Sequence, residues 1–300
     1  MVQKSDIQIV AVPSILGLQS DGVEKLPTAL LSRGLKQRLQ VTNPLIEIST
    51  LNHLRSNVRD EKTLLLNGEP LRQFSTDFHD AMKGMISPEK FLLVLGGDCS
   101  ILIGIMSALK SKGTYGLFFI DAHADFYQPE RSTTGEVADM DLAIVMGRGP
   151  EILTNIHDNA PYVKDKHVIH IGQRDWKETK KFNSQDIRET EVKCFNLDYI
   201  QEQRVETLMN EIDCYAKNLS LNGFWIHFDT DVLDDNINPA VDYRIPGGLS
   251  IGSCETILST LIKKYSIAGM SVTIFNPNLD TKGKIAEKLT SLISKVLATD

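Results

Sequence analysis

Short apolar runs that alternate with longer helix-like segments constrain the fold of this chain most strongly. The runs are rich in β-branched or aromatic residues and apolar on both faces, which is typical of strands buried in a parallel sheet. The alternation predicts an α/β protein with a mostly parallel sheet built from right-handed βαβ units. The predicted strands are 7–12, 91–97, 114–125, 167–172, 223–231 and 267–275, and the predicted helices are 26–39, 70–85, 100–112, 204–219, 254–265 and 284–298.

Composition narrows the class of protein. The 300 residues show no low-complexity segment, repeat or clear linker, and 42% hydrophobic with 24% charged residues excludes a disordered chain. A formal net charge of −7 argues against a nucleic-acid binder that relies on bulk positive charge. No run reaches the roughly 18 uninterrupted apolar residues of a membrane span, so no membrane partner is predicted.

Cysteine usage and the N-terminal residues bear on location. The four cysteines form no CxxC pair and are too sparse for a disulfide scaffold. The first residues lack the long apolar region of a signal peptide. We therefore expect reduced thiols in a cytoplasmic protein.

Potential metal ligands lie at or just after the carboxyl ends of three of the predicted strands. In a parallel sheet the carboxyl ends of the strands meet at one edge, where ligands bind, so these side chains are expected to converge. On an extended chain, residues spaced by two share a face. The three motifs are Cys99, then Asp121, His123 and Asp125, and then Asp229 and Asp231.

The residue types in these motifs favour a metal centre. Carboxylates gathered around one point repel one another unless a cation neutralises them. The alternative, solvated strand ends or helix caps, explains one such motif better than three. Four carboxylates, one imidazole and one thiol exceed what a single ion needs. The sequence therefore predicts a pair of divalent ions, Mn²⁺ by preference, with Zn²⁺, Fe²⁺ or Co²⁺ as other candidates.

The motifs show a family resemblance. GGDCS (96–100), DAHAD (121–125) and HFDTDVLDD (227–235) resemble the metal motifs of the ureohydrolase family of arginase, agmatinase and formimidoylglutamase. The stretches 13–35, 238–250 and 275–280 also resemble that family. The resemblance implies a single three-layer α/β/α domain over residues 1–300, with a mostly parallel central sheet and a dinuclear Mn²⁺ centre.

The resemblance also assigns roles to residues. It implies that a hydroxide between two ions attacks the guanidino or amidino carbon, with Asp121, Asp125 and Asp229 as catalytic residues. One ion would be held by Cys99, Asp121, Asp125 and Asp229, and the other by His123, Asp121, Asp229 and Asp231. His227, two residues before Asp229, is expected either to support the ligands or to be a core histidine beneath the sheet, the latter being favoured.

Two departures from the family pattern bear on the substrate. Cys99 stands where the family normally has histidine, and in this it resembles the Nω-hydroxy-L-arginine hydrolase of cycloserine biosynthesis. Ile274 stands where arginase and agmatinase have the glutamate that anchors the guanidinium. A hydroxyguanidine is less basic than a guanidine, so it tolerates the loss of this salt bridge better.

The remaining predicted substrate residues lie in two segments. Ser132, Thr134 and Glu136 fall where arginase binds the amino-acid end of its substrate. Asp175 is retained from the segment that holds the α-amino group, whereas Lys177 and Lys180 stand where acids are expected. These lysines indicate either an anionic substrate end or a solvated, lysine-rich start of a helix. Glu178, one register away, is an alternative for one of these acids. Asp139 is a candidate acid near the position of the family's proton-relay histidine, although a solvated loop residue is the favoured interpretation.

These inferences predict a metal-dependent hydrolase that cleaves a C–N bond of a linear amidine or guanidine. The favoured reaction converts Nω-hydroxy-L-arginine to L-ornithine and hydroxyurea. Arginase, agmatinase or formimidoylglutamase activity is the alternative within the enzyme class, and a non-catalytic metal-binding relative is the alternative outside it. The family resemblance makes a homo-oligomer, a trimer or hexamer, possible.

Overall fold

A parallel sheet forms the centre of the computed structural model, which describes residues 7–50, 55–56 and 58–298. Within these residues the sheet has eight strands in the order β2-β1-β3-β8-β7-β4-β5-β6, and every neighbouring pair is parallel. The strands are β1 (Ile7–Ala11), β2 (Ile46–Glu47), β3 (Phe91–Leu95), β4 (Tyr115–Ile120), β5 (Val168–Ile171), β6 (Lys193–Phe195), β7 (Gly223–Asp229) and β8 (Ile267–Thr273).

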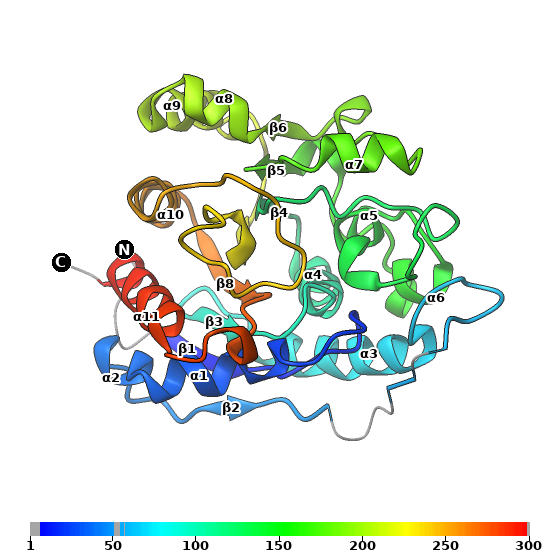
Figure 1. Cartoon of the computed structure of the whole chain (residues 1–300), viewed down its shortest axis with the longest axis horizontal. Coiled ribbons are helices and arrows are strands. Elements are labelled where there is room, and N and C mark those ends of the chain that lie inside the picture. The colour runs from blue at the N-terminus through cyan, green and yellow to red at the C-terminus, as the bar shows by residue number, and fades with distance from the viewer. Residues whose placement is uncertain (1–6, 51–54, 57, 299–300) are drawn as a thin grey trace.

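Helices cover both faces of this sheet (Figure 1). Alternate residues of β1 and β3 point into two separate apolar cores, one beneath each layer of helices. This arrangement confirms the predicted three-layer α/β/α class. The helices are α1 (Leu26–Ser32), α2 (Leu35–Arg38), α3 (Gly68–Met85), α4 (Ile101–Lys112), α5 (Asp141–Val145), α6 (Glu151–Thr154), α7 (Trp176–Lys181), α8 (Leu197–Glu202), α9 (Val205–Ala216), α10 (Ile251–Lys264) and α11 (Lys284–Leu297).

The layers follow from which helices each core contains. The helices α3, α4 and α5 contribute to one core, together with Phe74, Phe78 and Trp225. The helices α1, α9, α10 and α11 contribute to the other core, which also includes Phe118 and Phe228. No helix among the described residues is both long enough and apolar enough to cross a membrane.

Several predicted boundaries are wrong. The helix predicted over 26–39 is broken into α1 and α2, because Gly34 adopts a φ of 79°, which interrupts the helical path. The strands predicted over 114–125 and 223–231 end at Ile120 and Asp229. The short strands β2 and β6 were not predicted, since two or three residues carry no periodic signal.

The order of the strands explains where the site forms. The four central strands β3, β8, β7 and β4 are consecutive neighbours in the sheet. The residues at their carboxyl ends are Cys99 after β3, Ile274 after β8, Asp229 at the end of β7 and Asp121 after β4. Segments far apart in the sequence therefore meet at one edge, as expected for a parallel sheet.

Candidate metal centre and substrate cavity

The turn after β3 places Cys99 at the start of α4. The buried Asp98 holds this turn, because its carboxylate accepts hydrogen bonds from the backbone amides of Gly17 (3.2 Å) and Ser100 (2.9 Å). The Cys99 thiol is 2.8 Å from Asp229 Oδ2 and 3.2 Å from Thr273 Oγ1. Side chains from β3, β7 and β8 thus meet at one buried point.

Local turns, not an extended chain, orient the aspartates. Asp121 Oδ1 accepts a hydrogen bond from the His123 amide at 2.7 Å, and Asp229 Oδ1 accepts one from the Asp231 amide at 2.8 Å. Asp125 has a φ of 46°. The prediction that residues spaced by two share one face of an extended strand is therefore wrong, because these residues lie in turns. The side chains still converge, because each turn folds the next ligand back toward the sheet.

At this edge of the sheet, the potential ligand atoms form two clusters that share one residue. Within the described residues, Cys99, Asp121, His227 and Asp229 bring ligand atoms within 4.8 Å of one another, and all four are buried; we call them the inner cluster. Asp121, His123 and Asp125 do the same and form the outer cluster, in which His123 is half-buried. Asp121 belongs to both, an arrangement suited to a carboxylate between two ions.

Asp231 lies beside the outer cluster. The His123 imidazole is 2.9 Å from Asp231 Oδ2 and 3.6 Å from Asp121 Oδ1. Arg174 holds the Asp231 loop, since its Nη2 donates to the carbonyl of Asp231 at 2.7 Å and to that of Ile245 at 3.2 Å. The predicted ligands Cys99, Asp121, His123, Asp125, Asp229 and Asp231 all lie together at this edge; their roles as ligands stay a prediction.

The pKa values of the clustered carboxyl groups and of the neighbouring thiol reflect how closely these groups are packed. Burial, and next the charge of Asp231, raises the pKa of Asp121 to about 7. Burial and nearby carboxylates raise the pKa of Asp125 and of Asp229 well above the usual value. Burial, and next Asp229, raises the pKa of the Cys99 thiol. Without a cation, this group of side chains retains protons that aspartate normally loses.

His123 titrates in the opposite direction. Burial alone would lower the pKa of His123, but the neighbouring carboxylates, Asp231 first, outweigh it and raise the pKa well above the usual value. In the absence of metal, the imidazolium is thus the positive charge that these carboxylates attract.

The donors fit a divalent metal ion. Asp121 Oδ2 is buried and has no hydrogen-bond partner among the described residues, and such an atom is costly to leave unpaired. Carboxylate and imidazole donors suit Mn²⁺, and a thiolate donor extends the range to softer ions. A metal pair would therefore satisfy both the unpaired oxygen and the repulsion between the carboxylates.

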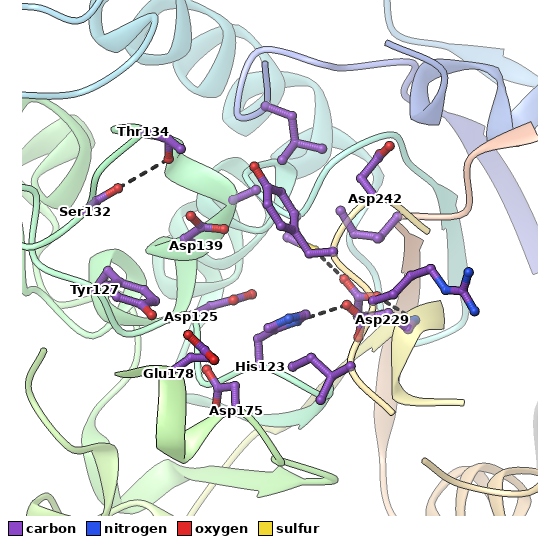
Figure 2. Close-up of a pocket in the computed structure, with 18 of the residues that line it drawn as sticks. His123, Asp125, Tyr127, Ser132, Thr134, Asp139, Asp175, Glu178, Asp229 and Asp242 are labelled. Atoms are coloured by element: carbon purple, nitrogen blue, oxygen red, sulfur yellow. Dashed lines mark hydrogen bonds and ion pairs between the residues drawn. The ribbon is translucent and has the colours of Figure 1, made fainter. Parts of the chain in front are cut away.

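A cavity of about 530 Å³ opens from this group of side chains. Figure 2 shows Asp125, Asp139, Asp175 and Glu178 on one side of it, and Asp229 on the other. The volume is in the range of small-molecule sites. We call the part around Cys99 and Asp229 the deep end, and the part around Ser132, Asp175 and Glu178 the mouth.

Three of the five predicted substrate residues line the cavity, namely Ser132, Thr134 and Asp175. Ser132 Oγ and Thr134 Oγ1 lie 3.3 Å apart at the mouth (Figure 2). Asp175 also has a structural role, since its Oδ2 accepts a hydrogen bond from the amide of Ala124 at 3.1 Å. This bond fixes the loop that carries the outer cluster.

The structure does not place Glu136 and Lys177 at the cavity. Glu136 is fully buried and accepts hydrogen bonds from the Gln19 amide (2.6 Å) and from Tyr243 Oη (2.5 Å), so its carboxylate is already used. Lys177 is exposed, and its ammonium lies 5.3 Å from the centre of the Trp176 ring. The helical turn of α7 instead brings Glu178 to the cavity, as the alternative assignment required.

Ile274 closes the deep end with an apolar side chain. It lies just after β8 with a φ of 69°, which is a rare conformation for a β-branched residue. Its amide donates to the carbonyl of Gly97 at 2.9 Å, which holds it there. Ile274 packs with Leu18, Cys99 and Ala138 in a small apolar cluster that faces the cavity. Strain of this kind is commonly found at functional sites.

Sequence reasoning missed several cavity residues. Arg131, Asp242, Tyr243 and Arg244 also line the cavity. The signals available were the predicted substrate residue Ser132 beside Arg131 and the family-like stretch 238–250, which contains the other three. Asp139, expected to be a solvated loop residue, also lines the cavity. Burial, and next the charge of Glu136, raises the pKa of Asp139 to about 7.

Together the fold and the site define a class: an α/β protein with two overlapping candidate metal clusters at the carboxyl edge of a parallel sheet. A sequence model described as the Arginase family matches residues 5–298. The chain belongs to that family. The predicted membership of the ureohydrolase family and the predicted hydrolase class are confirmed.

Individual relatives agree with this assignment. The chain is 29% identical to the arginase of Staphylococcus aureus strain MRSA252, over 98% of this chain and 97% of that one. The native structure of the arginase from Bacillus caldovelox matches with a TM-score of 0.85 and 26% identity, covering 99% of both chains. A formimidoylglutamase structure from Bacillus subtilis, at 18% identity and a TM-score of 0.71, shares the fold.

Proposed function

We propose that this protein hydrolyses a C–N bond of a linear amidine or guanidine that carries an α-amino acid group. The best single candidate is Nω-hydroxy-L-arginine, which with water would yield L-ornithine and hydroxyurea. The observation that carries this choice is the apolar side chain of Ile274 at the deep end of the cavity.

The deep end suits a weakly basic head group. A guanidinium keeps its charge near neutral pH and needs an acidic partner. On the β8 side the cavity offers Ile274, with Leu18 and Ala138 beside it. A hydroxyguanidine is less basic and enters partly neutral, so contact with these side chains costs it less desolvation free energy.

The mouth suits the charged end of an amino acid. Asp175 and Glu178 provide carboxylates for an α-ammonium group, and the exposed Arg131 provides a guanidinium for an α-carboxylate. Arg244 also lines the cavity, but its guanidinium is paired with Asp235 at 2.6 Å. Acidic and basic groups at one mouth support a zwitterionic substrate better than a purely anionic one.

We further propose that Cys99, Asp121, His123, Asp125, Asp229 and Asp231 hold two divalent ions, with Mn²⁺ as the first candidate and Zn²⁺, Fe²⁺ or Co²⁺ as others. When bound, the ions would supply a hydroxide nucleophile at neutral pH and polarise the electrophilic carbon. In this proposal Asp125, which lines the cavity, accepts a proton from the nucleophile. Asp139, which also lines the cavity and whose pKa is raised to about 7, donates a proton to the leaving amine.

Plain arginase activity is the second candidate, because the similar proteins carry that name and the acidic groups at the mouth fit the amino-acid end of arginine. Formimidoylglutamate is a weaker candidate substrate. Lys177 favoured an anionic substrate end, but neither Lys177 nor Lys180 lines the cavity.

The test compares substrates on one sample. Protein loaded with Mn²⁺ is assayed with L-arginine, Nω-hydroxy-L-arginine and N-formimidoyl-L-glutamate, and its metal content is measured. We expect about two ions per chain and a higher kcat/KM for the hydroxylated substrate. A higher kcat/KM for arginine would select the second candidate. Two bound ions without turnover of any of the three would overturn the substrate class.

A further inference from the structure

We propose that His227 is a direct metal ligand, which makes the inner cluster a thiolate, imidazole and carboxylate site for one divalent ion. The inference rests on the proposed metal centre but not on the proposed substrate. It assigns to His227 a role beyond that of a core histidine beneath the sheet.

The first observation is that His227 belongs to a buried set of donors. A ring nitrogen of His227 lies within 4.8 Å of the ligand atoms of Cys99, Asp121 and Asp229, and all four residues are buried. Asp121 Oδ2 in this set has no hydrogen-bond partner among the described residues. Four donors of three chemical kinds around one point match the requirements of a first-row divalent ion.

The second observation is that the ring is held in one orientation. The His227 ring stacks on Phe119, with centroids 4.9 Å apart and an angle of 12° between the planes. Its Nδ1 lies 3.0 Å from Ser271 Oγ, which also accepts a hydrogen bond from Trp225 Nε1 at 3.0 Å. A metal-binding histidine is typically fixed in this way, by a hydrogen bond from its other ring nitrogen.

The third observation is where Nε2 points. In the sheet His227 pairs with Ser271, and Asp229 pairs with Thr273. Nδ1 contacts Ser271 at the level of His227, while Nε2 lies 3.4 Å from Thr273 Oγ1, at the level of Asp229. The ring therefore extends along the strand toward the edge where the ligands gather. A contact of 3.4 Å is long for a hydrogen bond, which leaves the Nε2 lone pair available.

Thr273 links this nitrogen to the thiol. Its Oγ1 is also 3.2 Å from Cys99 Sγ, so Nε2 and Sγ flank the same hydroxyl. The ligand assignment requires the tautomer in which Nδ1 carries the proton and donates it to Ser271 Oγ, because Nε2 is then unprotonated. The inner cluster then offers a softer donor set than the outer cluster, whose donors are two carboxylates and one imidazole.

Cobalt provides a test that does not depend on turnover. Co²⁺-loaded protein labelled with ¹⁵N-histidine is examined by NMR for imidazole N–H signals shifted by the paramagnetic ion. We expect two such signals, from His123 and His227. One signal in protein that holds two Co²⁺ ions, or failure to bind Co²⁺, would overturn the proposal.

A variant of His227 and a matched control provide a second test of the ligand assignment. His227→Gln should lose one of the two shifted signals and weaken binding of one ion by at least about 100-fold in calorimetry, since changes that only support a ligand already cost 10- to 100-fold. His167→Gln is the matched control: His167 is also buried, but it lies outside every group of potential metal ligands among the described residues. Unchanged signals and affinity in His227→Gln would overturn the assignment.

The outcomes separate the two proposals. Two shifted signals without turnover of any tested amidine would leave the ligand assignment standing and overturn the proposed substrate class. Turnover by protein that binds two ions but shows a single shifted signal would overturn the assignment of His227 and leave the proposed substrate class standing. If His227→Gln does not fold, Ser271→Ala provides the test instead. This variant should weaken the binding of one metal ion by about 10-fold, while both shifted signals persist.

Discussion

The deep end and the mouth of the cavity are built by different means. At the deep end, Cys99, Asp121 and Asp229 lie at the ends of neighbouring central strands and are almost completely buried. At the mouth, Glu178 is exposed on the short helix α7, and Arg131 is exposed in a loop. The comparison teaches that the deep end is suited to chemistry that demands fixed geometry, whereas the mouth is suited to selecting a substrate.

The largest effect is expected from the residue shared by both clusters. Asp121→Asn removes the carboxylate charge from the inner and the outer cluster, so both ions and activity should be lost, with activity falling by more than about 100-fold. Metal analysis after dialysis and steady-state kinetics measure this. Asp234→Asn, which alters a carboxylate outside both clusters, should keep two ions. Retention of both ions in Asp121→Asn would refute the shared role.

Variants of Cys99 test whether the thiol at the deep end is a metal ligand. Cys99→Ser should weaken binding of one ion by about 10- to 100-fold, because a hydroxyl is a poorer ligand than a thiolate. Cys99→His should keep two ions and raise arginine hydrolysis relative to the hydroxylated substrate. Calorimetric titration with Mn²⁺ and with Zn²⁺ measures the affinities. Unchanged Mn²⁺ occupancy and turnover in Cys99→Ser would show that Cys99 is not a ligand.

Ile274 tests how the deep end selects the head group. Ile274→Glu provides an acidic partner for a guanidinium, and a hydrogen bond to a charged group contributes about 1.5–3 kcal/mol. We expect the ratio of kcat/KM for arginine over Nω-hydroxy-L-arginine to rise by about 10-fold or more. Ile274→Gln, similar in size but uncharged, serves as the control. An equal rise in both variants would show that charge is not the determinant.

Glu178 tests the mouth, where the effects should be smaller. Glu178→Gln removes an exposed carboxylate, and exposed ion pairs contribute about 1 kcal/mol or less. We expect KM to rise by about 5-fold with little change in kcat. Lys177→Gln alters the preceding residue, which does not line the cavity, and should leave KM unchanged. An effect of Lys177→Gln equal to that of Glu178→Gln would indicate a general charge effect.

The smallest effect concerns the pH dependence of stability in metal-free protein. The pKa of Asp139 is raised to about 7 in the folded state, from 3.8. Between these values the folded state binds a proton that the unfolded state lacks, so this carboxyl makes stability fall as pH rises from about 4 to about 7. Asp139→Asn should reduce that fall by about 1 kcal/mol, since solvent screens a half-buried group.

Urea unfolding of both proteins at several pH values measures the difference. Above pH 7 the variant should be the more stable of the two, and near pH 4 the two should converge. Parallel curves for the two proteins across the whole range would show that Asp139 titrates normally.

The central strands and the longer helices could be predicted because their patterns are strong. Buried parallel strands such as β3 and β7 appear as continuous apolar runs, and α11 shows clear helical spacing. The predicted ligands could be found because they lie at or just after the carboxyl ends of predicted strands. By contrast, β2 and β6 have two and three residues, too few for a period to show.

Other features depended on neighbours distant in the chain. The carboxylate of Glu136 is occupied by Tyr243 and Gln19, which lie in other segments. His227 was expected to be a core histidine, and only its pairing with β8 shows its Nε2 extending toward the edge of the sheet. Neither relation leaves a mark in the local sequence.

By itself the sequence determined the α/β alternation and the three candidate ligand motifs, because these depend on local periodicity and residue type. The resemblance to the family added that Ile274 stands where an acidic residue is expected. Only the tertiary structure decided which side chains share the cavity, how Asp121 joins two clusters, and why Glu178 lines the mouth while Lys177 does not. The physical reason is that burial, charge coupling and hydrogen bonding depend on distances between segments, and the packing of the sheet and helices sets these distances.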